Sequence, residues 1–76
     1  MDVLMPDLGD TPEAIVSRWH RRPGEAVQAG EILLEVETDK TSIDVPVPAG
    51  GVLGQILVEE GCSAAGGMRL AVIDEA

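Results

Sequence analysis

Residues 32–47, with the sequence ILLEVETDKTSIDVPV, consist of two short aliphatic runs on either side of a polar segment. The runs 32–36 and 43–47 have the length of β-strands and are shorter than ordinary helices. The segment between them, Glu37-Thr38-Asp39-Lys40-Thr41, has Asp and Lys at its centre, a composition typical of a tight β-turn. The stretch therefore predicts two strands joined by an exposed turn.

The rest of the chain continues this pattern of short apolar runs between Gly, Pro and acidic residues. No window of helical length has a 3.6-residue hydrophobic period that a Gly or Pro does not interrupt. The other expected strands, and then the turns between them, lie at residues 3–5, 15–21, 27, 52–58 and 70–73, and at 22–25, 29–30 and 59–61. We therefore predict an all-β fold, and a length of 76 residues suits one domain, residues 1–76.

Composition limits the partners and the compartment that we expect. Fourteen acidic residues against five basic ones give a net charge of −9, which disfavours nucleic acids and anionic membranes as partners. The single cysteine, Cys62, cannot form an internal disulfide, and no Cys/His cluster suggests a metal site. The first ten residues lack the features of a signal peptide. We therefore expect a monomer of the bacterial cytoplasm, or of the mitochondrial matrix if the protein is eukaryotic.

The two halves of the chain resemble one another. At a shift of 37 positions, glycines meet glycines and aliphatic residues meet aliphatic residues. The matched pairs include Gly24 and Gly61, Gly30 and Gly67, Ile15 and Val52, Trp19 and Ile56, Leu33 and Leu70, and Val36 and Ile73. The dipeptide Met5-Pro6 matches Val45-Pro46 at a shift of 40, which predicts three extra residues in the loop 7–14. A two-fold axis between the halves would place the Lys40 turn at one end and both termini at the other.

Lys40 is the only lysine in the chain, and the other four basic residues are arginines. A surface lysine usually serves solubility, and this segment alone leaves that interpretation open. A modification that forms an amide, in contrast, requires a primary amine displayed in a turn that an enzyme can recognise. Lys40 alone meets this requirement, so we take it as a candidate attachment site.

The segment VETDKTSIDVP, residues 36–46, resembles the lipoylation segment of the acyltransferase subunits of 2-oxo acid dehydrogenase complexes. Further similarity lies in MPDLG (5–9), in the segment from Trp19 through PGE (23–25), and in AGGVL (49–53), so it spans nearly the whole chain. The resemblance implies a flattened barrel or sandwich of two four-stranded antiparallel sheets with pseudo-two-fold symmetry. It also implies lipoic acid in amide linkage to Lys40, with recognition of the turn through Glu37, Asp39 and Thr41.

The resemblance further implies a carrier with no catalytic activity of its own. A thiamine-diphosphate-dependent 2-oxo acid decarboxylase would load the arm, an acyltransferase domain would pass the acyl group to coenzyme A, and dihydrolipoamide dehydrogenase would reoxidise the arm. A lipoate ligase, or a lipoyl or octanoyl transferase, would attach the lipoic acid. The family places the loop 7–11 beside the lysine turn, where it would help the decarboxylase to recognise its carrier.

Several alternatives remain open at this point. The segments WHRRPGE (19–25) and ETDK (37–40) look most like 2-oxoglutarate-type carriers, but pyruvate, branched-chain and acetoin complexes are not excluded. A biotin carrier shares the fold but has methionine on both sides of its lysine, whereas Lys40 has Asp and Thr. The carrier of the glycine-cleavage system is longer and has a different lysine context. The remaining alternative is an unmodified interaction barrel. The chain could be free-standing or a domain of a larger acyltransferase.

Three further residues that could carry chemistry have simpler interpretations. We expect His20 to be a surface residue without a catalytic role, because no Asp or Ser is placed to complete a triad with it. We expect Trp19 to be partly buried, as its large apolar ring favours. Cys62 is expected to be a passive thiol in a turn equivalent to that of Glu25.

Overall fold

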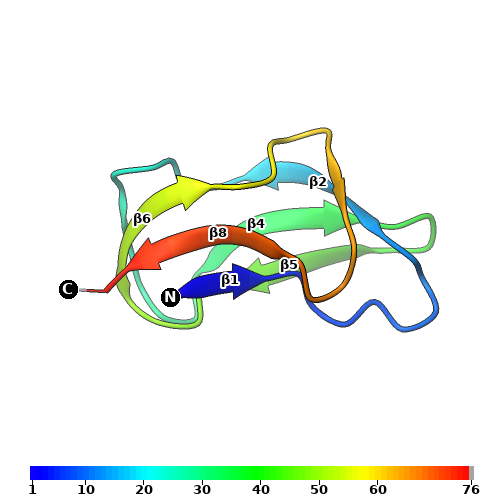
Figure 1. The fold of residues 1–76 in the computed structure, drawn as a ribbon, viewed down its shortest axis with the longest axis horizontal. Helices are drawn as coiled ribbons and strands as arrows, with labels where there is room; N and C mark the ends of the chain where they lie inside the picture. Colours follow the sequence, from blue (N-terminus) through cyan, green and yellow to red (C-terminus); the bar gives the residue numbers. More distant parts are fainter. Residues whose placement is uncertain (76) are drawn as a thin grey trace.

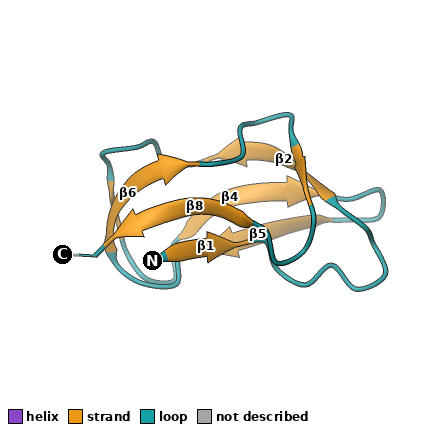
Figure 2. Cartoon of the chain, viewed as in Figure 1, coloured by secondary structure: helices purple, strands orange, loops and turns teal. Residues whose placement is uncertain are grey.

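The computed structural model describes residues 1–75, which form eight β-strands in two sheets. The strands are β1 (Asp2–Leu4), β2 (Ala14–Trp19), β3 (Ala26–Val27), β4 (Ile32–Glu37), β5 (Ser42–Pro46), β6 (Gly51–Ile56), β7 (Ser63–Ala64) and β8 (Arg69–Asp74). The sheets are antiparallel, with strand orders β1-β8-β6-β3 and β5-β4-β2-β7. Figure 2 shows these residues without a helix, and hence without one that could cross a membrane. The predicted all-β fold of two four-stranded antiparallel sheets is confirmed. Of the two forms expected, a flattened barrel or a sandwich, the structure is a sandwich, because the two sheets do not close into a barrel.

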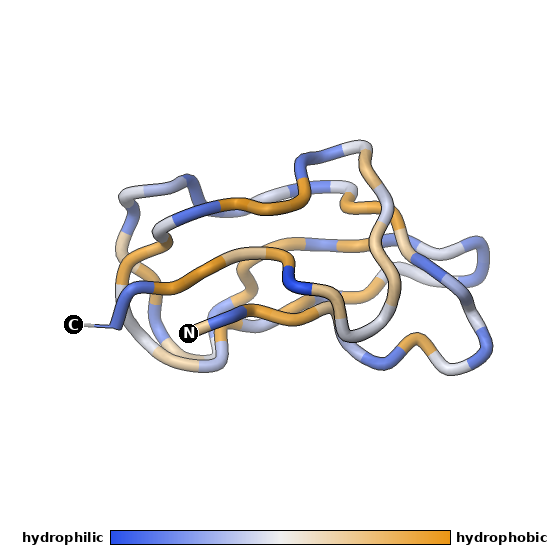
Figure 3. Tube along the Cα trace, viewed as in Figure 1, coloured by the Kyte–Doolittle hydropathy of each residue, from blue (hydrophilic) through white to orange (hydrophobic). Residues whose placement is uncertain are grey.

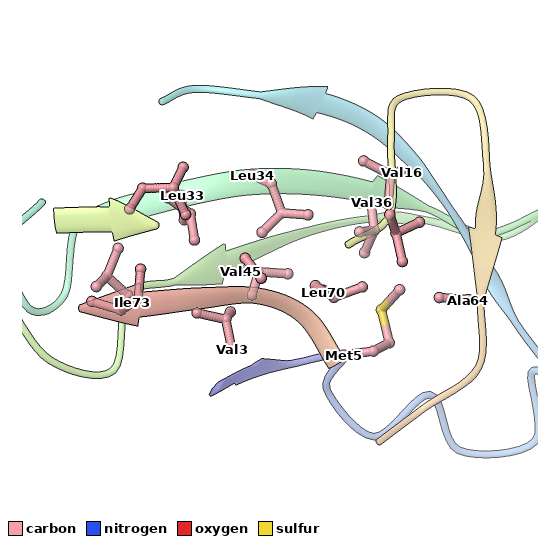
Figure 4. Close-up of a cluster of buried hydrophobic side chains, with 14 of the residues drawn as sticks. Val3, Met5, Val16, Leu33, Leu34, Val36, Val45, Ala64, Leu70 and Ile73 are labelled. Carbon is pink, nitrogen blue, oxygen red and sulfur yellow. The ribbon is translucent and has the colours of Figure 1, made fainter. Parts of the chain in front are cut away.

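Aliphatic side chains fill the space between the two sheets. Figure 3 shows the apolar residues along the strands and the polar ones at the turns. In Figure 4, side chains from both sheets meet in one core, among them Leu34 and Val45 from one sheet and Val3 and Ile73 from the other. No polar or charged side chain within residues 1–75 is buried. The fold is therefore stabilised mainly by the removal of apolar area from water.

The structure confirms the internal repeat at a shift of 37 positions. Strands β2, β3 and β4 correspond to β6, β7 and β8, each with both ends offset by 37. Gly24 and Gly61 have φ angles of 94° and 88°, a conformation that a side chain disfavours. The hydrogen bonds repeat as well, since Gly24 N donates to Leu53 O at 2.7 Å and Gly61 N donates to Val16 O at 2.8 Å. The two halves therefore share one backbone conformation over most of their length.

The predicted shift of 40 for the first strand is wrong. Val3 lies opposite Ala71 and Val45 lies opposite Leu34, and Leu34 and Ala71 are themselves equivalent at the shift of 37. Val3 is therefore equivalent to Val45 at a shift of 42, so the loop between β1 and β2 holds five extra residues instead of three. A slip of two residues leaves every side chain on the same face of a strand. The apolar pattern could not distinguish the two registers, and a chance match of X-Pro dipeptides favoured the wrong one.

Two strands are shorter than predicted, and one was not predicted. β2 ends at Trp19 instead of Arg21, and β6 ends at Ile56 instead of Val58. β7 pairs only with the first two residues of β2, so it offers no carbonyl to the end of that strand. The Trp19 main-chain N–H donates to the Glu60 carboxylate instead, at 2.8 Å. β7 itself contains only Ser and Ala, so no apolar pattern marks it as a strand.

The two ends of the sandwich differ in what they carry. In Figure 1 the N-terminus and the C-terminal end of β8 lie toward one end of the long axis, and the hairpin between β4 and β5 projects from the other. The molecule measures 36 Å along this axis. At the end with the termini, the Met1 ammonium donates to Ile73 O at 2.8 Å and Ile73 N donates to Met1 O at 2.7 Å. The predicted placement of the lysine turn opposite the termini is confirmed.

Candidate functional site

The candidate site is the turn that joins β4 to β5. The last cross-strand pair of this hairpin is Glu37 with Ser42. Beyond it, Thr38 N donates to Thr41 O at 2.8 Å, which leaves Asp39 and Lys40 as the two central residues of the turn. This is the tight turn with Asp and Lys at its centre that the sequence predicts. The turn is the part of the hairpin farthest from the termini (Figure 1).

The hydroxyl of Thr38 makes three hydrogen bonds to the main chain of this turn. Its Oγ1 accepts hydrogen bonds from Lys40 N at 3.2 Å and from Thr41 N at 3.1 Å. The same hydroxyl donates to Thr41 O at 3.2 Å. Thr38 was expected in the turn from the sequence, but with no role of its own. A Thr or Ser at the first position of a turn is the signal that could have shown it, because such hydroxyls often bond the main chain two or three residues ahead.

The side chains expected to mark the site lie together on this turn. Glu37, Asp39, Lys40 and Thr41 are all exposed, whereas Thr38 is half-buried. Among the residues that the structure describes, the Lys40 ammonium has no ion-pair or hydrogen-bond partner. The turn therefore presents a primary amine to solvent with two carboxylates close by in the chain. Such an amine is free to act as a nucleophile once it is deprotonated.

The loop between β1 and β2 lies beside this turn, as expected. Its residues Thr11, Pro12 and Glu13 line a shallow hollow together with β2 and with the end of the β4–β5 hairpin. The loop is held by local contacts, because Gly9 N donates to the Asp7 carboxylate at 2.9 Å. The loop that holds the five extra residues of the first half therefore lies next to the lysine turn. A role for this loop in recognition by a decarboxylase stays a prediction.

The other residues considered for chemistry lie away from the turn. His20 Nε2 is 3.5 Å from a Glu35 carboxylate oxygen, and both side chains are partly exposed. Trp19 is half-buried, as predicted, and its indole N–H donates to Val58 O at 3.0 Å. Cys62 is an exposed free thiol in a turn equivalent to that of Glu25. No group of three His, Cys, Asp or Glu side chains within residues 1–75 could hold a metal ion.

Comparison with known proteins identifies the family. Residues 1–73 match the family described as Biotin-requiring enzyme. The chain is similar to the dihydrolipoyllysine-residue succinyltransferase component of the 2-oxoglutarate dehydrogenase complex of Escherichia coli strain K12. The two are 45% identical over 62 residues, and this aligned segment is 80% of the chain and 15% of that protein. The corresponding component of Cupriavidus necator is 41% identical over 75 residues, covering 97% of the chain and 18% of that protein. The chain thus spans less than a fifth of the length of these relatives.

Solved structures agree with the sequence comparison. The lipoyl domain of the 2-oxoglutarate dehydrogenase complex from Azotobacter vinelandii matches with a TM-score of 0.80 and 33% identity, over 99% of this chain and 96% of that one. The lipoyl domain of the dihydrolipoyl succinyltransferase component from Escherichia coli matches with a TM-score of 0.80 and 39% identity, over 99% of this chain and 95% of that one. Both matches cover nearly the whole of each chain, so the agreement extends beyond a shared fold class. The chain therefore belongs to the biotin- and lipoyl-attachment family, and within that family to the lipoyl domains.

Proposed function

We propose that residues 1–76 form a single lipoyl carrier domain and that lipoic acid is attached to Lys40. The observation that carries this proposal is the position of Lys40. The only lysine of the chain lies at the tip of the β4–β5 turn, exposed and at the opposite end from the termini (Figure 1). Membership of the lipoyl domains supplies the chemistry that such an amine would serve.

The turn suits the formation of an amide. The Lys40 Nζ would form a bond to the carboxyl carbon of an activated lipoate, the activating group would leave, and the amine would lose a proton. Because no described side chain is bonded to this ammonium, the reaction breaks no contact of the folded chain. A bound lipoyl group would supply a dithiolane that takes up an acyl group and two electrons. We propose that the attaching enzyme recognises the exposed neighbours of Lys40 in the chain, Glu37, Asp39 and Thr41.

The arrangement of the two ends explains why a carrier of this shape is useful. A chain tethered through its termini would direct the Lys40 turn away from the tether, at the far end of a 36 Å molecule. A tethered carrier raises the effective concentration of its cargo at each site that it visits. The rigid sandwich adds reach without adding flexible chain, because its two sheets share one core.

The partners follow from the relatives and are proposals for this chain. We propose that a thiamine-diphosphate-dependent 2-oxo acid decarboxylase, an acyltransferase catalytic domain and dihydrolipoamide dehydrogenase act on the modified domain. We place these enzymes in a complex of the 2-oxoglutarate type. The support is that both the curated relatives and the solved structures come from 2-oxoglutarate dehydrogenase complexes. These relatives are bacterial, which favours the bacterial cytoplasm as the compartment.

Mass spectrometry of the intact chain tests the attachment site. Co-expression with a lipoate ligase should add one lipoyl group per chain, and Lys40→Arg should abolish the addition. The matched control is Arg18→Lys in the Lys40→Arg background, which places an exposed amine on β2 and should remain unmodified. A lipoyl group on Lys40→Arg would refute the assignment, and a biotinyl group on the parent would favour a biotin carrier instead.

Acylation of the modified chain tests the proposed complex. The decarboxylating component of a 2-oxoglutarate dehydrogenase complex, supplied with 2-oxoglutarate, should acylate the lipoylated chain with a higher kcat/KM than the corresponding pyruvate component supplied with pyruvate. Unmodified chain and the Lys40→Arg variant serve as controls and should take up no acyl group. A preference for the pyruvate component would contradict the assignment to the 2-oxoglutarate type while leaving the carrier role intact.

A further inference from the structure

The turn that presents Lys40 lacks the backbone conformation that usually forms a two-residue hairpin. Such hairpins favour type I′ or II′ turns, which need a positive φ at one or both central residues. Within residues 1–75, only glycines have a positive φ, so Asp39 and Lys40 both have negative values. Among the described residues, no main-chain carbonyl accepts a hydrogen bond from the N–H groups of Lys40 and Thr41.

Thr38 supplies the acceptor for these groups. Its Oγ1 receives the N–H groups of Lys40 and Thr41, at 3.2 Å and 3.1 Å, and contacts Thr41 O at 3.2 Å. One hydroxyl thus joins three main-chain groups of the turn. Thr38 can do this because it is half-buried at the base of the turn, whereas the central residues are exposed. No side-chain hydrogen bond of Asp39 or Lys40 is found among the described residues, so Thr38 supplies the side-chain contacts within the tip.

The direction of the Lys40 side chain depends on the same contacts. Its ammonium has no partner among the described residues, so the contacts of the folded chain act on this side chain only through the main chain from which it starts. A tip without the Thr38 hydroxyl would present the amine over a wider range of positions. Bond formation is sensitive to such spread, since a displacement of about 1 Å can reduce a rate about a hundredfold.

We infer that Thr38 is a positioning residue, whose hydroxyl orders the turn so that the Lys40 amine reaches the attaching enzyme in a reactive position. The inference rests on the proposed attachment at Lys40 and goes beyond it. Thr38 does not take part in the bond that forms, and it acts through the main chain of Lys40 and Thr41. A side chain outside the lysine itself would then control how fast the carrier is modified.

Two variants separate the hydroxyl from the shape of the side chain. Thr38→Val keeps the branched shape and loses the hydroxyl, and Thr38→Ser keeps the hydroxyl and loses the methyl group. With a lipoate ligase, lipoic acid and ATP, Thr38→Ser should be modified with nearly the parental kcat/KM. Thr38→Val should lose about tenfold, which corresponds to about 1.4 kcal/mol of transition-state free energy. The loss should appear in kcat and not in KM, because the surface that binds the ligase is retained.

Hydrogen exchange of the unmodified chain gives a readout that does not need the ligase. In Thr38→Val the amides of Lys40 and Thr41 should exchange faster than in the parent, while the Val36 amide within β4 should not change. Equal kcat/KM for the two variants, an equal loss in both, or a loss only in KM would each overturn the inference. Failure of the parent itself to be modified would refute the proposed function, and this inference with it. A modified parent with an unaffected Thr38→Val refutes the inference alone.

Discussion

Leu33 and Leu70 occupy equivalent positions in the two halves, so the same truncation at either should have the same effect. Both side chains are fully buried, and β4 and β8 have identical patterns of buried and exposed residues. Figure 4 places Leu33 nearer the end with the termini and Leu70 farther along the core. If the two-fold relation extends to packing energy, truncation at these two sites should have the same cost.

The expected cost of each truncation is a large part of the total stability. A chain of this length has a free energy of unfolding of about 4–11 kcal/mol. Leu→Ala in a fully buried site costs roughly 2–5 kcal/mol, with the upper values where the surroundings cannot collapse into the cavity. Both leucines are packed between two sheets that are each held by hydrogen-bonded ladders, so collapse is restricted. We expect Leu33→Ala and Leu70→Ala to cost about 3 kcal/mol each and to agree within about 1 kcal/mol.

Urea unfolding followed by far-UV circular dichroism and by Trp19 fluorescence measures these costs. Lys40→Ala is the control, because the Lys40 side chain is exposed and has no ion-pair partner within residues 1–75. This variant should remain within about 0.5 kcal/mol of the parent. Unequal m-values among the variants would show a change in the unfolded state and would exclude that variant from the comparison. A cost below about 1 kcal/mol at one leucine and above about 3 kcal/mol at the other would refute the energetic equivalence of the halves.

Two further predictions concern the turn and the packing of a strand. Exchange of Asp39 and Lys40 should leave the circular dichroism unchanged, because both residues are exposed, but should sharply reduce lipoylation by moving the amine one residue along the hairpin. Modification at the parental rate would show that the position of the amine is not the signal. Gly51→Ala should cost roughly 1–3 kcal/mol in urea unfolding, because a Cβ there would collide with the carbonyl oxygen of Asp74. Gly50→Ala, whose Cβ would meet only ordinary contacts, is its control, and equal costs would contradict the steric argument.

The sequence allowed the fold class, most strands and the placement of the lysine turn to be predicted, because each depends on a local period or on the repeat. Alternation along the chain shows which residues of a strand are buried, and the matched glycines Gly24 and Gly61 show where the backbone must turn. The register of β1 could not be predicted, since a slip of two residues preserves the alternation. The short strand β7 was missed because Ser63 and Ala64 carry no apolar pattern.

For the candidate site, too, some features could be predicted from the sequence and others could not. The exposure of Lys40 and its place at the tip follow from the polar segment between two apolar runs, and the structure has both features. The contacts of the Thr38 hydroxyl could not be predicted in the same way. They depend on the φ angles of the central residues, and the turn composition is compatible with more than one turn type. Sequence patterns thus located Lys40, and the structure was needed to show which contacts order its turn.

The order of the strands also determines which strands are exposed at the edges of the two sheets. The outer strands of the two sheets are β1, β3, β5 and β7, with three, two, five and two residues. An outer strand is a template on which another chain can add a strand, and short, charged or proline-containing edges prevent this. The longest of the four, β5, carries an exposed Asp44 and ends at Pro46. The net charge of −9 adds repulsion between copies, so both the edges and the charge oppose edge-to-edge assembly.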